Sequence, residues 1–319
     1  MIEETILRLE GLIPLENVLV VTAASQVDAV REALPQLSTD NILAEPCARN
    51  TAGAVAWAAH VLAERDPNSI QAVLAADHVI EPAESFRKTL AAAAAQAKNG
   101  GTLITFGVKP THPATGYGYI EVDGQIATIQ KVPVFAVSRF VEKPDKERAA
   151  EFVANKRFYW NSGMFVWQTS AIQEAFKKHA PDFAKAFKSL GKKRTLEQVY
   201  ESLPSLPVDV AIMERADNVR MLPIDYGWSD VGSWSALPAL SEAGPSGNWS
   251  LQGDEGLLVS VDSKGCVAYS EGKRVIALVG VEDLIVVQTE GATLVCPRDR
   301  AQDVKAIVEE LREKGPDFL

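Results

Sequence analysis

Short apolar runs alternate with longer amphipathic or Ala-rich stretches over the first third of the chain. The apolar runs predict buried strands at 17–22, 41–46, 72–78 and 102–108. The stretches between them predict helices at 25–34, 51–64 and 83–98. Strands that alternate with helices of this length indicate βαβ units, and right-handed crossovers place helices on both faces of the sheet. The pattern therefore predicts a Rossmann-like α/β domain with a mostly parallel mixed sheet.

The pattern changes twice further along the chain. Residues 111–230 mix short strands with helices at 146–155 and 170–179, which indicates an elaborated lobe of the same domain. A Gly-, Pro- and Ser-containing segment at 242–250 is typical of a linker. Beyond it come five β-type runs between turns and an amphipathic helix at 301–314, without a clear long-period repeat. We expect one domain at 1–245 and a small β-rich region at 250–319.

Composition limits the classes of partner. The chain has 319 residues, of which 47% are hydrophobic, and a net charge of −10. This charge argues against nonspecific binding of nucleic acid or of an anionic membrane surface. No apolar stretch is long enough to span a bilayer, and the first residues lack a signal-peptide pattern, so we expect a cytoplasmic protein. The three cysteines, Cys47, Cys266 and Cys296, are widely spaced, which favours reduced thiols over a metal site.

Two acidic residues follow strand-like or aromatic segments. Asp77 ends the run at 72–78, and Asp230 lies in the sequence YGWSDVGSW. Either residue alone fits a helix cap or a turn equally well. Two carboxylates at separate loop ends could instead hold Mg²⁺, which binds few protein oxygens and leaves positions for phosphate oxygens.

The sequence EPCARNTAG at 45–53 follows a strand and opens a helix. At such a position backbone N–H groups and the side chains of Asn50 and Thr51 face an incoming anion. Arg49 favours an anion or a base edge as the ligand. Simple capping of the helix by Asn50 or Thr51 explains the same residues without a ligand.

Three further motifs carry residues suited to a sugar phosphate. Gly118, in GYGYIE, permits close backbone approach to a ligand, although a tight turn explains it equally well. Glu142 and Lys143, in FVEKP, would bind hydroxyl groups and a phosphate, whereas adjacent strand residues point to opposite faces and one could be a surface charge. Asn161, in WNSGMFVW, precedes a buried strand or simply forms a turn.

Seven motifs in this order (EPCARNTAG, AADH, TGYGYIE, FVEKP, WNSGMF, VDVAIME and YGWSDVGSW) resemble the mannose-1-phosphate guanylyltransferases, a family of sugar-nucleotide pyrophosphorylases. The resemblance covers nearly the whole chain. It implies transfer of a guanylyl group from GTP to mannose 1-phosphate, with Mg²⁺ as cofactor and no covalent enzyme intermediate. It also implies roles for individual residues. By this resemblance, Asp77 and Asp230 bind the metal, and Lys143, Asp77 and Asp230 are catalytic. The nucleotide would bind to Glu45, Arg49, Asn50 and Thr51. The sugar and its phosphate would bind to Gly118, Glu142, Lys143 and Asn161.

The resemblance breaks at the amino terminus. Members of this family begin with a strand and a Gly-rich loop that carries an Arg and, further on, a Lys, whereas MIEETILRLEGL resembles the helix that follows this loop. We expect a start codon upstream of Met1 and little activity from the chain that begins there. A chain that is naturally short and catalytically disabled is the alternative.

Other functions remain open at this point. A non-catalytic relative that binds sugar nucleotide in a regulatory role is one alternative. A pyrophosphorylase for another hexose 1-phosphate or another nucleotide is the other. The sequence leaves a homo-oligomer open.

Overall fold

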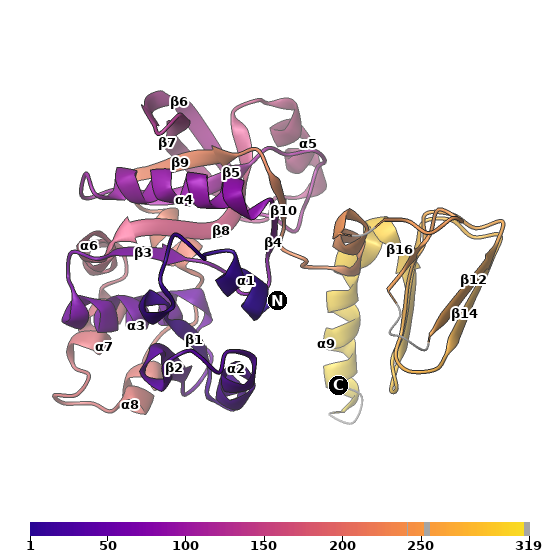
Figure 1. The fold of residues 1–319 in the computed structure, drawn as a ribbon, viewed down its shortest axis with the longest axis horizontal. Helices are drawn as coiled ribbons and strands as arrows, with labels where there is room; N and C mark the ends of the chain where they lie inside the picture. Colours follow the sequence, from indigo (N-terminus) through magenta and orange to yellow (C-terminus); the bar gives the residue numbers. More distant parts are fainter. Residues whose placement is uncertain (241, 252–255, 316–319) are drawn as a thin grey trace. The chain divides into compact units, whose positions relative to one another are not determined.

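The computed structural model describes residues 1–240, 242–251 and 256–315. The chain divides into two compact units, Met1–Trp228 and Ser229–Leu319, which are described separately (Figure 1). In the described residues, no helix has both the length and the apolar character needed to cross a membrane.

Unit 1 is built on a six-stranded mixed sheet with the order β3-β8-β5-β9-β7-β6. Its strands are β3 (Ile70–Val73), β8 (Phe158–Gln168), β5 (Leu103–Val108), β9 (Val219–Ile224), β7 (Val132–Val141) and β6 (Tyr119–Ile129). Four of these strands (β3, β5, β9 and β6) run in one direction, and β8 and β7 run against them. The expected α/β class is confirmed. Most neighbouring pairs are nevertheless antiparallel, because each reversed strand lies between strands of the majority direction.

Helices cover both faces of this sheet (Figure 1). They are α3 (Asn50–Arg65), α6 (Thr169–His179) and α7 (Pro181–Lys188) on one face and α4 (Ala83–Ala97) on the other. Successive strand residues point to opposite faces, so Phe165 and Trp167 of β8 pack with the first group and Met164 and Val166 pack with α4. This alternation explains the continuous apolar pattern of the central strands.

Two further pairs of strands complete the unit. Strands β1 (Val20–Ala23) and β2 (Ile42–Glu45) form a separate parallel pair, and β4 (Val79–Glu81) pairs with β10 (Gly227–Ser229). Further α-helices are α1 (Ile2–Leu7), α2 (Val27–Ala33), α5 (Lys146–Ala154) and α8 (Leu196–Glu201), and Asp209–Met213 forms a π-helix, η4.

Two sequence predictions for this unit are wrong in extent. The strand predicted at 72–78 ends at Val73, so Asp77 lies in a loop before β4 rather than at a strand end. The reason is that β8 leaves the regular ladder beyond Phe165, where Gly163 has φ +68° and the β5–β8 register shifts. The short strands predicted around 117–143 form one long β6–β7 hairpin, closed by Gln130 and Lys131, both at positive φ.

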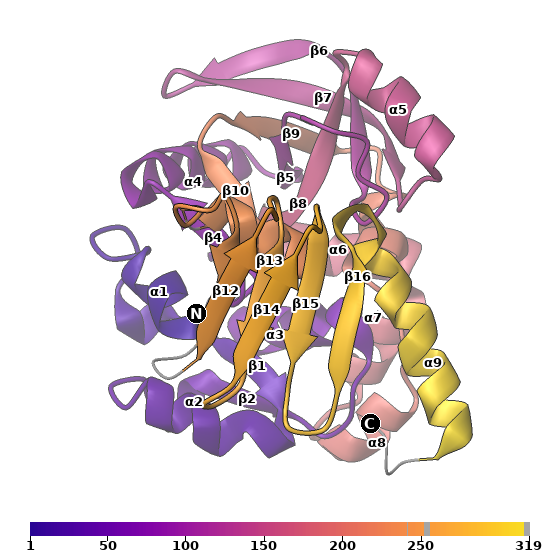
Figure 2. The same cartoon turned by 90° about the vertical axis from the view of Figure 1, so that its right-hand side faces the viewer.

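Unit 2 contains the expected β-rich region and a terminal helix. Its strands are β11 (Trp249–Ser250), β12 (Leu257–Val261), β13 (Val267–Ser270), β14 (Val275–Val279), β15 (Leu284–Gln288) and β16 (Thr293–Pro297), followed by α9 (Val304–Lys314). Strands β11, β13 and β15 form consecutive parallel pairs, and so do β12 and β14, whereas β16 is antiparallel to β15 (Figure 2).

The strand register of unit 2 shows a repeat that the sequence pattern does not reveal. Trp249 pairs with Val267 and Val267 with Ile285, a step of 18 residues each time, and Leu257 pairs with Val275 at the same step. The chain therefore coils in successive 18-residue turns. The expectation of no long-period repeat is wrong, because the turns share apolar positions rather than identical residues.

Candidate active site

Asp77 lies in the loop between β3 and β4, and its side chain is exposed. Within the described residues, its carboxylate makes no hydrogen bond or ion pair. The two carbonyls that flank it in sequence are bound by side chains of the first turns of the chain. Thr5 Oγ1 donates to Ala76 O at 3.2 Å, and Arg8 Nη2 donates to His78 O at 3.1 Å. The backbone of this loop is therefore held while the carboxylate stays accessible.

An aromatic cluster joins this loop to three of the other motifs. The Trp228 ring lies edge-on to His78 at 5.4 Å between centroids, and its Nε1 donates to His78 Nδ1 at 3.4 Å. Tyr117 packs against both Trp228, at 5.5 Å, and Trp160, at 5.0 Å. Gly163 lies beside His78, because a Cβ on this glycine would be 3.9 Å from His78 Cε1. Segments from AADH, TGYGYIE, WNSGMF and YGWSD thus meet in unit 1.

Gly118, Glu142 and Asn161 come together beside this cluster. A Cβ added to Gly118 would lie 3.0 Å from Glu142 Oε2 and 3.7 Å from Asn161 Cβ, so the glycine keeps this space open. The Asn161 backbone N–H donates to Gly118 O at 2.8 Å. The Lys143 ammonium pairs with Glu142 Oε1, and Lys143 itself has a positive φ of 37°. Four of the residues predicted to bind the sugar phosphate are therefore neighbours.

Asp209 is a member of this group that sequence reasoning missed. Its Oδ1 accepts a hydrogen bond from Asn161 Nδ2 at 2.7 Å, while Asn161 Oδ1 accepts from Thr105 Oγ1 at 3.1 Å. These two contacts fix the orientation of the amide, which leaves its second N–H for a ligand. Its motif, VDVAIME, contributed to the resemblance, but nothing local marks Asp209, since its partner lies 48 positions away.

The surroundings of Asn161 are acidic, with Asp209 bonded to its amide and Glu142 nearby, paired with the Lys143 ammonium. Burial raises the pKa of Asp209 above its usual value. The hydrogen bond from Asn161 lowers this pKa in part, and the negative charge of Glu142 raises it further. The pKa of Glu214 is raised by burial and by the same two carboxylates. Carboxylates accept hydrogen bonds from hydroxyl groups, and an ammonium binds phosphate. The arrangement suits a polyhydroxylated ligand with one phosphate group.

The predicted nucleotide segment lies at the amino end of α3. Asn50 begins this helix with φ +58°, and its Oδ1 accepts from Thr51 N at 2.8 Å. Arg49 Nε donates to Tyr200 O at 2.7 Å, so its guanidinium already binds the main chain. Glu45 Oε1 is buried without a hydrogen-bond partner among the described residues, and burial raises the pKa of this carboxyl.

Residues 206–209 connect these two parts of unit 1. Ala52 N donates to Leu206 O at 3.1 Å, and Val208 N donates to Thr51 Oγ1 at 2.8 Å. The next residue, Asp209, holds Asn161. The start of α3 and the residues around Asn161 are therefore joined by one short segment through direct hydrogen bonds.

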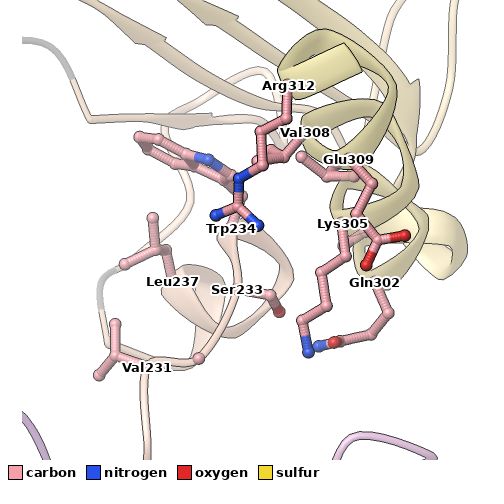
Figure 3. Close-up of a pocket in the computed structure, with 12 residues that line it drawn as sticks. Val231, Ser233, Trp234, Leu237, Gln302, Lys305, Val308, Glu309 and Arg312 are labelled. Atoms are coloured by element: carbon pink, nitrogen blue, oxygen red, sulfur yellow. The ribbon is translucent and has the colours of Figure 1, made fainter. Parts of the chain in front are cut away.

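Asp230 belongs to unit 2, where its Oδ1 accepts a hydrogen bond from Gly232 N at 3.1 Å. Unit 2 also contains a cavity of about 690 Å³ between the segment after Asp230 and α9. Trp234 and Leu237 face Lys305, Val308 and Arg312 across it (Figure 3). None of the predicted site residues lines this cavity. Val231, Gly232, Ser233 and Trp234, which follow Asp230 in the YGWSDVGSW motif, do line it.

The fold of unit 1 defines a class: an α/β protein with a mixed sheet covered by helices on both faces. Comparison with known proteins makes this class specific. The family model for nucleotidyl transferases matches residues 1–245, and the model described as a MannoseP isomerase/GMP-like beta-helix domain matches residues 256–311. This chain belongs to the nucleotidyl transferase family.

Individual relatives agree with this assignment. The chain is 39% identical over 327 residues to a mannose-1-phosphate guanylyltransferase of Escherichia coli, covering 99% of this chain and 67% of the relative. It is 41% identical over 295 residues to the xanthan biosynthesis protein XanB of Xanthomonas campestris, covering 89% and 60%. A crystal structure from Thermus thermophilus, titled a mannose-1-phosphate geranyltransferase, matches with a TM-score of 0.86 and 33% identity, covering 98% of this chain and 89% of that one. The chain thus spans 67% of the length of the Escherichia coli relative and 60% of that of XanB.

Proposed function

We propose that this protein transfers a guanylyl group from GTP to mannose 1-phosphate and so forms GDP-mannose and pyrophosphate. The observation that carries the proposal is the convergence of Gly118, Glu142, Lys143 and Asn161 in one part of a nucleotidyl transferase. The choice of mannose and guanine follows the Escherichia coli relative, which is named a mannose-1-phosphate guanylyltransferase.

Each of these four residues has a role that its chemistry supports. Glu142 would accept hydrogen bonds from sugar hydroxyl groups, and the free amide N–H of Asn161 would donate to one. The Lys143 ammonium, which pairs with Glu142, would share its hydrogen bonds between Glu142 and the phosphate of mannose 1-phosphate. Gly118 keeps the space that the sugar ring needs.

The nucleotide would lie at the start of α3, with Glu45, Arg49, Asn50 and Thr51 as its predicted contacts. The positive end of the helix dipole favours a negatively charged ligand here, while the N–H groups of Thr51 and Ala52 already bind Asn50 Oδ1 and Leu206 O. Arg49 and Thr51 bind the segment around Tyr200 and Val208, so they would also shape the site rather than only touch the nucleotide.

Mg²⁺ fits the donor set that the chain offers. The described residues contain no group of three or more His, Cys, Asp or Glu side chains that could hold a metal by themselves. Mg²⁺ needs only one or two carboxylates when substrate phosphates and waters complete its shell. Asp77, exposed and unpaired among the described residues, meets this need, and Asp230 remains the predicted second ligand. When bound, the ion would neutralise phosphate charge.

The reaction is an in-line displacement. A phosphate oxygen of mannose 1-phosphate forms a bond to the α-phosphorus of GTP, and the bond from this phosphorus to the bridging oxygen of the β-phosphate breaks. Pyrophosphate leaves with the electron pair. The protein contributes positioning and charge, because two anions must be held in contact against their repulsion.

The test is a substrate panel on the protein expressed from its complete reading frame. We expect mannose 1-phosphate with GTP and Mg²⁺ to give the highest kcat/KM, and glucose 1-phosphate or other nucleoside triphosphates to react much more slowly. Equal rates with all hexose 1-phosphates, or a preference for another nucleotide, would require a different assignment of the site.

A further inference from the structure

The loop that carries Asp77 is held from outside by the amino-terminal helix. Thr5, within α1, and Arg8, just after it, donate to the carbonyls of Ala76 and His78, the residues on either side of Asp77. Apart from strand ladders, residues 74–77 make no backbone–backbone hydrogen bond within the described part of the chain. In Figure 1, α1 lies beside β4, the strand into which this loop leads.

Both donors are buried, so water competes little for their bonds. Thr5 is 6% exposed and Arg8 is 7% exposed. The Arg8 guanidinium also lies over the Phe86 ring, at 5.8 Å from its centroid, and the Arg8 carbonyl accepts from Arg87 Nη1 at 3.1 Å. Because Arg8 is fixed on several sides, its bond to His78 O restrains the loop more than an exposed arginine would.

We propose that Thr5 and Arg8 are positioning residues that preorganise the Asp77 loop for its metal ion. The proposal rests on the proposed function, in which Asp77 is a metal ligand. The Asp77 carboxylate has no partner of its own among the described residues, so the backbone on either side determines where it stands. A loop that is already ordered loses little conformational entropy when the ion and the nucleotide bind.

A matched pair of isosteric substitutions tests the role of Thr5. Thr89 is also 6% exposed and donates to a backbone carbonyl, that of Ser85, at 3.1 Å, but it makes no bond to the Asp77 loop. Thr5→Val and Thr89→Val each remove one buried hydroxyl-to-carbonyl bond. We expect similar decreases in unfolding midpoint from the two substitutions.

The affinity for Mn²⁺ should differ between Thr5→Val and Thr89→Val. Mn²⁺ is titrated into the protein with a GTP analogue that carries a methylene bridge between its α- and β-phosphorus atoms, so that no transfer takes place. We expect Thr5→Val to weaken Mn²⁺ binding about 2- to 10-fold, the range of one hydrogen bond, and Thr89→Val to leave it unchanged. Equal Mn²⁺ affinities in the two variants would overturn the proposal.

Arg8 gives a second, independent comparison. Arg8→Met should weaken Mn²⁺ binding at least as much as Thr5→Val, and Arg8→Lys should restore part of it, because lysine keeps one charged donor. No recovery with lysine, together with an unchanged affinity in Thr5→Val, would show that these residues serve only the fold. The Thr5 pair keeps the test decisive if Arg8→Met does not fold.

Asp77→Asn distinguishes failure of this inference from failure of the proposed function. If Asp77→Asn loses Mn²⁺ binding and Thr5→Val does not, the metal role of Asp77 stands and the positioning role is wrong. If Asp77→Asn binds Mn²⁺ normally, both are wrong. In the Asp77→Asn background, Thr5→Val should have no further effect on Mn²⁺ binding, since it acts through Asp77.

Discussion

Replacing Asp209 by asparagine should weaken binding of the sugar phosphate while it stabilises the fold. Asp209 Oδ1 accepts the 2.7 Å hydrogen bond from Asn161 Nδ2, which orients the amide expected to contact the sugar. An asparagine side chain can still present an oxygen to Asn161, so the bond persists without its charge. A bond to a charged group contributes about 1.5–3 kcal/mol and a neutral one about 0.5–1.5 kcal/mol. The difference, about 1 kcal/mol, corresponds to roughly a fivefold higher KM for mannose 1-phosphate.

The effect on stability has the opposite sign. Because burial raises the pKa of Asp209 above its usual value of 3.8, the folded state favours the protonated carboxyl. The stability linked to this group is therefore full below the unfolded pKa and is lost as pH rises through the higher folded pKa. An asparagine side chain does not ionise, so the variant loses no stability in this way as pH rises. The Asp209→Asn variant should gain stability over the wild type as pH rises through this window and keep the gain at neutral pH.

The assay combines steady-state kinetics with denaturant unfolding at several pH values. Asp217→Asn serves as the control, because Asp217 is exposed, pairs with Lys178 at 3.3 Å and has a lowered pKa through this pairing. We expect it to leave KM unchanged and to give no gain in stability. An unchanged KM in Asp209→Asn, or a loss of stability at neutral pH, would refute the role assigned to the Asp209–Asn161 bond.

Four other substitutions test separate parts of the account. Gly118→Ala places a Cβ 3.0 Å from Glu142 Oε2, so we expect about a tenfold higher KM for mannose 1-phosphate, and an unchanged KM would argue against sugar binding beside Gly118. Lys143→Ala should cost about 2–4 kcal/mol in kcat/KM, while Glu142→Gln should mainly reduce discrimination between sugar epimers; wild-type kinetics in both would contradict their assignment. Asn248→Ala removes two buried bonds, from Cys266 N and to Ser263 O, and calorimetry should show unit 2 losing about 2–4 kcal/mol with no change in unit 1.

The sequence was informative where local periodicity decides the structure. The helices at Asn50–Arg65 and Ala83–Ala97 lie within a residue or so of their predicted bounds, because amphipathic periodicity and turn residues mark their ends. The prediction of a strand through Asp77 was wrong. A strand there would need β8 to continue as its hydrogen-bonding partner, and the bulge at Gly163 that ends this pairing lies some 90 positions away in the sequence. Strand pairing is a long-range property that a local pattern does not contain.

The candidate site shows the same division. Gly118, Glu142, Lys143 and Asn161 were found from motif order, and the structure makes them neighbours. For Arg49 and Thr51 the sequence suggested side chains that face a ligand. Their bonds to the segment around Tyr200 and Val208, more than 150 positions away, became visible only in the structure. Asp209 was overlooked for the same reason.

The most direct measurement of guanylyl transfer follows the α-phosphorus of GTP. The protein, expressed from its complete reading frame, is incubated with Mg²⁺, mannose 1-phosphate and GTP labelled with ³²P at the α-position, and the products are separated. The account predicts that the label moves into GDP-mannose, that unlabelled pyrophosphate forms in equal amount, and that Asp77→Asn nearly abolishes both. Label that remains in GTP, or that is released as GMP or GDP without a sugar attached, would contradict it.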